Sequence, residues 1–308
     1  MKRIIDPGRA VETVTMIDHI VYSDVKDRQG NELKLELSVM SAMGNSEMAA
    51  ALGRTKTKEY IAKKPAVLWY NGGSWRGVDK NSQIGELVFL AKAGYVVVCV
   101  YYRSIFQGHF PDQLIDAKTA VRFLRAHSLQ YSVDPDRIAV MGRSAGGQLA
   151  AMVGTNDGKY ISSEWAGYSS NVSCVWDMFG PADLKYMAEL HLKELAEGKL
   201  AGGRWGNILE TAEGAALGGP EESLLERAEE FSPRWNISRN MAPILIMHGD
   251  ADPLIPWEMS EDFYNALCRT GKEGQSDFCL VRHAGHGTAE FFQEESQKIA
   301  LDFFGKWL

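Results

Sequence analysis

A serine between two glycines is the residue of this chain best placed to do chemistry. Gly142, Ser144 and Gly146 form a Gly-x-Ser-x-Gly pattern that follows the apolar run 138–141 and precedes a helix-like segment. A strand turning sharply into a helix strains the residue at the turn, and the flanking glycines let strand and helix approach closely. The hydroxyl is then exposed beside a helix N-terminus, which favours developing negative charge. The pattern predicts that Ser144 is a nucleophile.

A serine hydroxyl needs a base within hydrogen-bond reach, and one histidine suits this role best. His286 lies between two glycines in a short loop, after a predicted strand at 277–282 and before the last predicted helix. His283 is the alternative candidate. His248 closes another predicted strand, and we interpret it as a structural loop residue.

Two carboxylates just past the strand predicted at 243–248 could orient that histidine. Asp252 precedes Pro253, which holds its backbone extended. Its side chain is thereby projected towards a neighbour, whereas Asp250 is expected to brace the turn. The order serine, acid, histidine matches the order expected for this type of sheet.

The third requirement is a pair of donors for the oxyanion of a tetrahedral intermediate. Residues 70–75 read Tyr-Asn-Gly-Gly-Ser-Trp and follow an early predicted strand. A glycine-rich loop there can point backbone N–H groups at the serine, and the amide of Ala145 would complete the oxyanion hole.

The elements that must position these residues alternate along the chain. Residues 11–22 and 32–40 predict an antiparallel hairpin around 27–30, and 44–64 is expected to be a surface loop or insertion. Strands are predicted at 65–70, 95–101, 138–141, 172–178, 243–248 and 277–282, with helices at 81–93, 112–130, 257–269 and 288–305. This alternation predicts an α/β fold whose mostly parallel sheet is covered on both faces, with reactive residues at the carboxyl ends of strands.

The stretch 183–232 interrupts this alternation. It contains a charged helical segment at 183–197, a glycine-rich run at 202–206 and an acidic helical segment at 221–230. We interpret it as an insertion that forms a lid or a substrate wall in a single domain of residues 1–308. A solvated excursion without a role is the alternative.

Composition limits the function classes. The 308 residues carry a net charge of −7, which argues against nucleic acid or an anionic membrane as a partner. The N-terminus lacks a signal-peptide core and no apolar run approaches the length of a membrane span, so a cytoplasmic location is expected. The four cysteines form no metal-binding pattern.

These motifs together resemble the α/β-hydrolases, specifically the hormone-sensitive-lipase-like and BD-FAE-like esterases, over roughly residues 60–308. The resemblance rests on runs at 71–75, 102–103, 134–138, 142–147, 248–253 and 285–287. It implies Ser144 as nucleophile, Asp252 as acid and His286 as base, with oxyanion donors from the backbone of Gly73, Ser74 and Ala145. Such esterases mostly hydrolyse short-chain carboxylic esters, and several remove acetyl or feruloyl groups from plant polysaccharides.

Two positions depart from the pattern of these esterases. Asn71 stands where a histidine is usual, so any bracing of the loop must come from its amide. Arg143 places a cation beside the nucleophile, where it could bind an anionic substrate group or form a salt bridge to the scaffold. Three tryptophans could also contact substrate, although a tryptophan more often packs in the core: Trp75, Trp205 and Trp257.

The sequence therefore predicts a serine carboxylesterase that needs no metal or organic cofactor. Its partner is expected to be a small-molecule ester, with acetylated sugars or xylan fragments as the leading substrates. A feruloyl esterase and an amide hydrolase of the arylformamidase type are the alternative activities. A catalytically silent hydrolase fold that acts as a binding module is the alternative from a different class.

Overall fold

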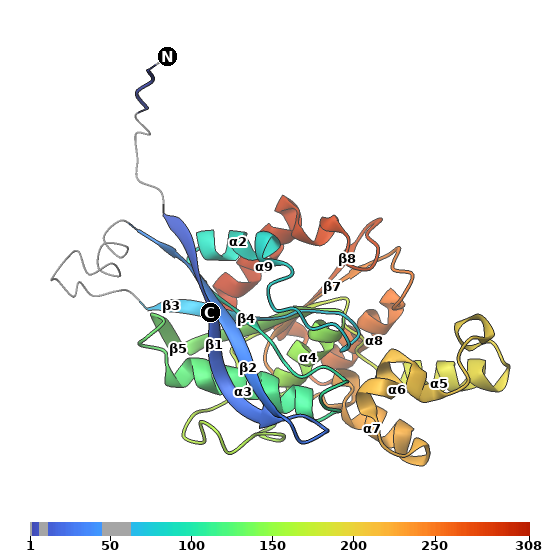
Figure 1. Ribbon diagram of the computed structural model, residues 1–308. Helices are drawn as coiled ribbons and strands as arrows, with labels where there is room; N and C mark the ends of the chain where they lie inside the picture. The colour runs from blue at the N-terminus through green and yellow to red at the C-terminus, as the bar shows by residue number, and fades with distance from the viewer. Residues whose placement is uncertain (1, 6–11, 45–62) are drawn as a thin grey trace.

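The computed structural model describes residues 2–5, 12–44 and 63–308 (Figure 1). The loop or insertion predicted at 44–64 falls almost entirely outside these residues. Within them, no helix is long and apolar enough to cross a membrane.

One sheet of eight strands organises the described chain, in the order β1-β2-β4-β3-β5-β6-β7-β8. The predicted hairpin is confirmed as β1 (Thr13–Lys26) and β2 (Glu32–Met43), and β2 also pairs antiparallel with β4 (Val96–Val100). All other neighbours are parallel: β3 (Lys64–Tyr70), β5 (Val133–Arg143), β6 (Val175–Met178), β7 (Ile244–Gly249) and β8 (Ser276–Val281). The predicted α/β class with a mostly parallel sheet is confirmed.

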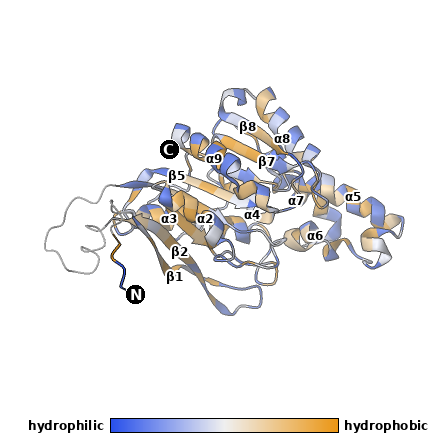
Figure 2. Cartoon of the chain, turned by 90° about the horizontal axis from the view of Figure 1, so that it is seen from above, coloured by the Kyte–Doolittle hydropathy of each residue, from blue (hydrophilic) through white to orange (hydrophobic). Residues whose placement is uncertain are grey.

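Helices cover both faces because the central strands are apolar on both sides. Leu68 and Val98 point into one core with α3 (Asp112–Ala126), α4 (Ala145–Val153) and α8 (Trp257–Arg269). Val67 and Val97 point the other way, against α2 (Ile84–Lys92) and α9 (Glu294–Trp307). The alternation of strand side chains thus gives two cores, and the apolar strands lie enclosed between helices in Figure 2.

The segment between β6 and β7 forms a helical group at the end of the molecule away from the N-terminus (Figure 1). Its α5 (Leu184–Ala196) and α7 (Leu224–Glu230) confirm the two predicted helices. The short α6 (Ala212–Leu217) was not predicted, because its Ala-Glu-Gly-Ala-Ala-Leu sequence is too brief to show a helical period. Short 3-10 turns complete this part, at Leu200–Gly203, Ile208–Glu210, Glu221–Ser223 and Pro233–Trp235.

Element boundaries differ from prediction by a few residues. Helix α3 ends at Ala126 rather than at 130, where the His127 ring bonds the carbonyl of Phe123. Strand β5 begins at Val133 instead of 138. The final helix α9 starts at Glu294, after a 3-10 turn at Ala289–Phe292; another 3-10 turn, Glu273–Gln275, precedes β8.

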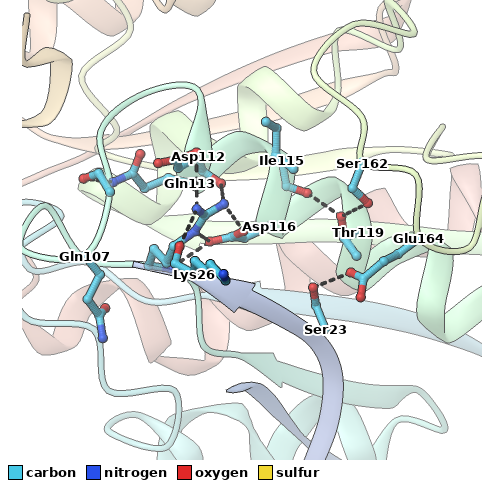
Figure 3. A network of polar contacts seen from close by, with 12 residues as sticks. Ser23, Lys26, Gln107, Asp112, Gln113, Ile115, Asp116, Thr119, Ser162 and Glu164 are labelled. Carbon is cyan, nitrogen blue, oxygen red and sulfur yellow. Dashed lines mark hydrogen bonds and ion pairs between the residues drawn. The ribbon is translucent and has the colours of Figure 1, made fainter. Parts of the chain in front are cut away.

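A buried ion pair joins the hairpin, the loop after β4 and helix α3. The guanidinium of Arg103 donates to both carboxylate oxygens of Asp116, at 2.9 and 2.8 Å, and lies 3.2 Å from Asp112. It also reaches the carbonyl of Lys26, at the end of β1. Figure 3 shows Asp112 and Asp116 of α3 lying close to Lys26 at the end of β1. This pair therefore fixes where the loop after β4 leaves the sheet.

Breaking the pair on one side is expected to destabilise the fold strongly. In Asp116→Ala the Arg103 cation stays buried and keeps only the more exposed Asp112 as a charged partner, and breaking a buried pair on one side typically costs about 3–5 kcal/mol. We expect a loss of this size in the free energy of unfolding measured by urea denaturation. The double variant Arg103→Met/Asp116→Leu, which removes both charges, should recover most of it. A loss below about 1 kcal/mol in the single variant would contradict this role.

Candidate active site

The turn that carries Ser144 is built by close backbone contacts. Ser144 lies between β5 and α4 with φ of +51°, a strained value for a residue with a side chain. A Cβ atom on Gly146 would overlap the carbonyl oxygen of Tyr70 in β3, and one on Gly142 would overlap the carbonyl of Gly146. Both glycines are thus sterically required, as the sequence pattern predicted. The N–H of Ser144 donates to the carbonyl of Met178 at 2.9 Å, which fixes the turn to β6.

The structure brings the predicted nucleophile, base and acid together in one hydrogen-bonded chain. Nε2 of His286 lies 2.9 Å from Oγ of Ser144, and Nδ1 of His286 lies 2.7 Å from Oδ2 of Asp252. The three residues follow β5, β7 and β8, so the carboxyl ends of parallel strands gather them. The Phe179 ring packs edge-on against the imidazole of His286 at 4.8 Å between ring centres and limits its movement.

The two alternative candidates lie elsewhere in this region. His283 is exposed, and its backbone N–H donates to Oδ1 of Asp250 at 2.6 Å. This bond joins the loop after β7 to the loop after β8, and it gives Asp250 the bracing role that was predicted.

The carboxylate of Asp252 is buried but remains charged. Burial raises its pKa, but hydrogen bonds from His248, from His286 and from the backbone N–H groups of Ile255 and Leu254 outweigh this effect and hold the pKa well below its ordinary value. An ionised carboxylate only accepts hydrogen bonds, so Nδ1 of His286 must carry the proton. The lone pair of Nε2 then faces the hydroxyl of Ser144.

His248 has a positioning contact that the sequence did not indicate. It is fully buried at the end of β7, and its Nε2 lies 3.0 Å from the carbonyl of Ile255 and 3.3 Å from Oδ2 of Asp252. Both of these atoms are acceptors, so Nε2 carries the hydrogen and Nδ1 accepts from the hydroxyl of Ser260 at 2.7 Å. The ring of His248 therefore helps to hold the carboxylate of Asp252 in position. The only signal in the sequence was its place at a strand end, four residues before the acid.

The glycine-rich loop after β3 runs directly beside the serine. A Cβ atom on Gly72 would lie 3.1 Å from Cβ of Ser144 and 2.8 Å from the carbonyl oxygen of Arg143. The loop turns through positive φ values at Gly73 (+119°) and Ser74 (+54°). Within residues 63–308, the backbone N–H groups of Gly73, Ser74 and Ala145 donate to no acceptor. All three are therefore available to a ligand.

The amide of Asn71 braces this loop where a histidine is usual in similar esterases. Its Nδ2 donates to the carbonyls of Gly72 and Gly77 at 3.0 and 3.5 Å. The backbone carbonyl of Asn71 accepts a hydrogen bond from the hydroxyl of Tyr102 at 2.7 Å, which ties the loop to the chain after β4.

Arg143 lies beside the histidine loop and has a scaffold partner. Its side chain is largely buried, and its Nη1 is 4.0 Å from a carboxylate oxygen of Glu86. The same Nη1 lies 3.8 Å from the place that a Cβ atom on Gly287 would take. The predicted salt bridge between Arg143 and the scaffold is thus formed with Glu86, and 4.0 Å is long for an ion pair.

The three tryptophans named from the sequence lie in different surroundings. Trp75 is only 2% exposed and packs edge-on against Phe110, so this candidate for substrate contact is a core residue. Trp205 is 41% exposed and lines a hollow of about 610 Å³ together with Ser74 of the glycine-rich loop. Trp257 is the partly buried first residue of α8.

A second buried carboxylate lies beneath the turn and was missed entirely. Asp177 in β6 is fully buried; its Oδ1 accepts the N–H of Gly180 at 3.0 Å, and its Oδ2 has no hydrogen-bond partner among the described residues. A Cβ atom on Gly147 would overlap this carboxylate. Burial raises the pKa of Asp177 to about 7.

Comparisons with known proteins agree on one family. A model of the BD-FAE family matches residues 55–267, which include Ser144 and Asp252 but end before His286. Esterase LipC of Mycobacterium tuberculosis is 29% identical over 226 residues, covering 72% of this chain and 53% of LipC. The chain spans about half the length of the curated relatives that it matches most strongly.

Solved structures share the whole fold. A truncated form of a carbohydrate esterase from gut microbiota superposes with a TM-score of 0.73 at 24% identity, covering 95% of this chain and 96% of that one. A bifunctional GH43-CE protein of Bacteroides eggerthii gives a TM-score of 0.71 at 25% identity, with coverage of 94% and 35%. The fold is therefore that of the α/β-hydrolases.

The raised pKa of Asp177 predicts a pH-dependent stability. Between its ordinary pKa of 3.8 and about 7, the folded protein holds a proton that the unfolded chain has released. The stabilisation is complete below pH 3.8 and is lost as the pH rises through 7. An asparagine does not titrate, so Asp177→Asn lacks this loss. Between pH 5 and pH 8 the free energy of unfolding of the wild type should therefore fall by roughly 2 kcal/mol more than that of the variant.

Urea denaturation at the two pH values measures this difference. Asp302→Asn, at an exposed carboxylate of α9, reports what removal of a surface charge does by itself. Equal pH dependence in wild type and Asp177→Asn would show that Asp177 is already ionised at pH 5.

Proposed function

The chain belongs to the BD-FAE family, and from this premise we propose that it is a serine carboxylesterase acting on short-chain acyl esters. One observation carries the proposal: Ser144, His286 and Asp252 form a continuous hydrogen-bonded chain whose acid is ionised. Three backbone N–H groups without an acceptor lie beside the serine, which is the arrangement that acyl transfer requires.

Acylation begins when Oγ of Ser144 attacks the ester carbonyl carbon. Nε2 of His286 takes the hydroxyl proton, and the negative charge of Asp252 stabilises the imidazolium that forms. The carbonyl oxygen becomes an oxyanion and accepts hydrogen bonds from the N–H groups of Gly73, Ser74 and Ala145. The bond to the alcohol oxygen then breaks, and that oxygen leaves with the proton from His286.

Deacylation repeats these steps with water as the nucleophile. His286 takes a proton from water as the water oxygen attacks the acyl-enzyme carbonyl. The bond to Oγ then breaks, the carboxylic acid is released, and Ser144 regains its proton. Because Asp252 is charged throughout and His248 supports it, the imidazole keeps one orientation during both halves.

Acetyl esters of sugars or xylan fragments are the substrates that we propose. The exposed ring of Trp205 stands beside the proposed oxyanion loop, and an indole face stacks well on a sugar ring. Relatives named as esterases support ester hydrolysis, and the fold is shared with a carbohydrate esterase.

We also propose that the insertion at 183–232 acts as a substrate wall of a single domain. Nη2 of Arg76, in the glycine-rich loop, donates to the carbonyls of Glu210 and Thr211 at 2.9 and 3.3 Å. The loop and the insertion are thus tied together in this conformation, which favours a wall over a lid.

Loss of the nucleophile tests the proposed activity. With p-nitrophenyl acetate, Ser144→Ala is expected to lower kcat by at least about a thousandfold, because attack then depends on water alone. Its circular dichroism spectrum and melting temperature should match those of the wild type. Ser104→Ala, in the loop after β4, is a matched control that should keep most of the activity. If turnover did not depend on Ser144, the esterase proposal would be contradicted, and a catalytically silent fold that acts as a binding module would remain.

A panel of acyl groups tests the proposed substrate class. We expect kcat/KM to be highest for acetyl and to fall from butyryl to octanoyl esters, with turnover of acetylated xylo-oligosaccharide. A preference for methyl ferulate would favour the feruloyl esterase, and a preference for an N-aryl formamide the amide hydrolase. A preference for octanoyl esters would contradict all three readings of the site.

A further inference from the structure

A second hollow continues the one beside Trp205. It has a volume of about 410 Å³ and shares two residues with the first hollow, Arg76 and Leu209. Its remaining walls come from the hairpin turn at Arg28, the loop that carries Phe106 and His109, and the insertion around 214–219. We call these two adjoining hollows the groove: Ser74 of the proposed oxyanion loop lines the first, and Arg28 of the β1–β2 turn lines the second.

Two arginines line this groove without a carboxylate partner. Within the described part of the chain, neither Arg28 nor Arg76 forms an ion pair with Asp or Glu. Their side-chain hydrogen bonds to other described residues go to neutral backbone carbonyls, from Arg28 to Ile105 at 3.3 Å and from Arg76 to Glu210 and Thr211. Such bonds orient a guanidinium but leave its charge uncompensated. An acidic chain of net charge −7 thus keeps a locally cationic groove.

The acidic side chain in the lining of the groove is already engaged. Glu210 lines the first hollow, and its Oε2 accepts the N–H groups of Gly206 and Asn207 at 2.8 and 3.2 Å. It caps the 3-10 turn Ile208–Glu210 in this way. Free N–H donors therefore remain on both guanidinium groups, each of which has five.

The walls of the groove are held in place before any ligand binds. The backbone N–H of Arg28 donates to the carbonyl of Gln107 at 2.8 Å, which joins the hairpin turn to the loop. The His109 ring bonds the carbonyl of Ala215 at 3.0 Å, and the N–H of Phe110 bonds that of Ala216 at 2.9 Å. The ion network around Asp112 and Asp116 anchors the same loop from behind, with Gln107 at its edge (Figure 3).

The groove also offers an apolar surface beside the charges. The Phe106 side chain is 60% exposed and Leu209 is 36% exposed, both on the walls of the second hollow. A sugar ring presents C–H groups to such a surface, while a planar carboxylate matches the fork of an arginine.

We propose that this groove binds a uronic acid residue of the substrate, on the alcohol side of the ester, with the carboxylate held by Arg28 and Arg76. This assignment rests on the proposed esterase function. It deepens that function to acetylated acidic oligosaccharides, because a small acyl group leaves the alcohol side to fill the groove.

Binding to the Ser144→Ala protein tests the groove without requiring catalysis. Isothermal titration compares xylotriose carrying one glucuronic acid branch with the same oligosaccharide after reduction of its carboxyl group to an alcohol. We expect the acidic form to bind at least about tenfold more tightly, and this ratio to fall as salt is raised from 50 to 500 mM. Arg28→Gln and Arg76→Gln, each added to Ser144→Ala, should bring the ratio close to one.

Arg269→Gln, at an exposed arginine of α8, is the matched control and should keep the full ratio. Equal binding of the two oligosaccharides, or a ratio that survives both groove variants, would overturn the proposal. Failure of the esterase proposal is a separate result, since it appears as the absence of Ser144-dependent turnover of p-nitrophenyl acetate. Ratios of kcat/KM for the acetylated forms of the two oligosaccharides extend the test to turnover.

Discussion

The site depends on one steric constraint: β3, β5 and the start of α4 approach so closely that backbone touches backbone. The carbonyl of Tyr70 occupies the space that side chains at Gly142 and Gly146 would need. Ser144 is therefore forced to positive φ at the one point where its hydroxyl faces outward. The same close approach brings the glycine-rich loop beside it, because that loop is the direct continuation of β3. The positions of the proposed nucleophile and oxyanion donors are thus set by the packing of the sheet.

Two buried carboxylates near the serine turn have pKa values shifted in opposite directions. Asp252 has several donors and stays ionised, whereas Asp177 has a single donor and a raised pKa. Asp177 lies within β6, and Asp252 lies in the loop after β7. Burial raises the pKa of both carboxylates, so the lowered pKa of Asp252 follows from its hydrogen bonds. His248 belongs to the first arrangement, because its ring supports the acid without reaching the serine.

The sequence predicted the elements and the gathering of the site better than the interactions beneath it. The sequence predicts that Ser144, Asp252 and His286 lie close together, because each follows an apolar strand and parallel strands end at the same edge of the sheet. The role of His248 depends on how the chain after β7 folds back onto the end of that strand, and the isolation of Asp177 depends on what packs against β6. Neither is visible in a single sequence. The same holds for Trp75, since a loop position does not decide between substrate contact and core packing, and Phe110 covers the ring.

The proposed base follows an edge strand of the sheet. Among the described residues, strand β8 lies at one edge and pairs with β7 alone, and the loop that carries His286 continues from its end. An edge strand with one neighbour opens at lower free energy than the central strands do. Local fraying of β8 would carry the imidazole away from Ser144 while the central sheet and most of both cores stay folded. Loss of activity on heating therefore reports local opening of this sheet edge earlier than a spectroscopic signal of global unfolding does.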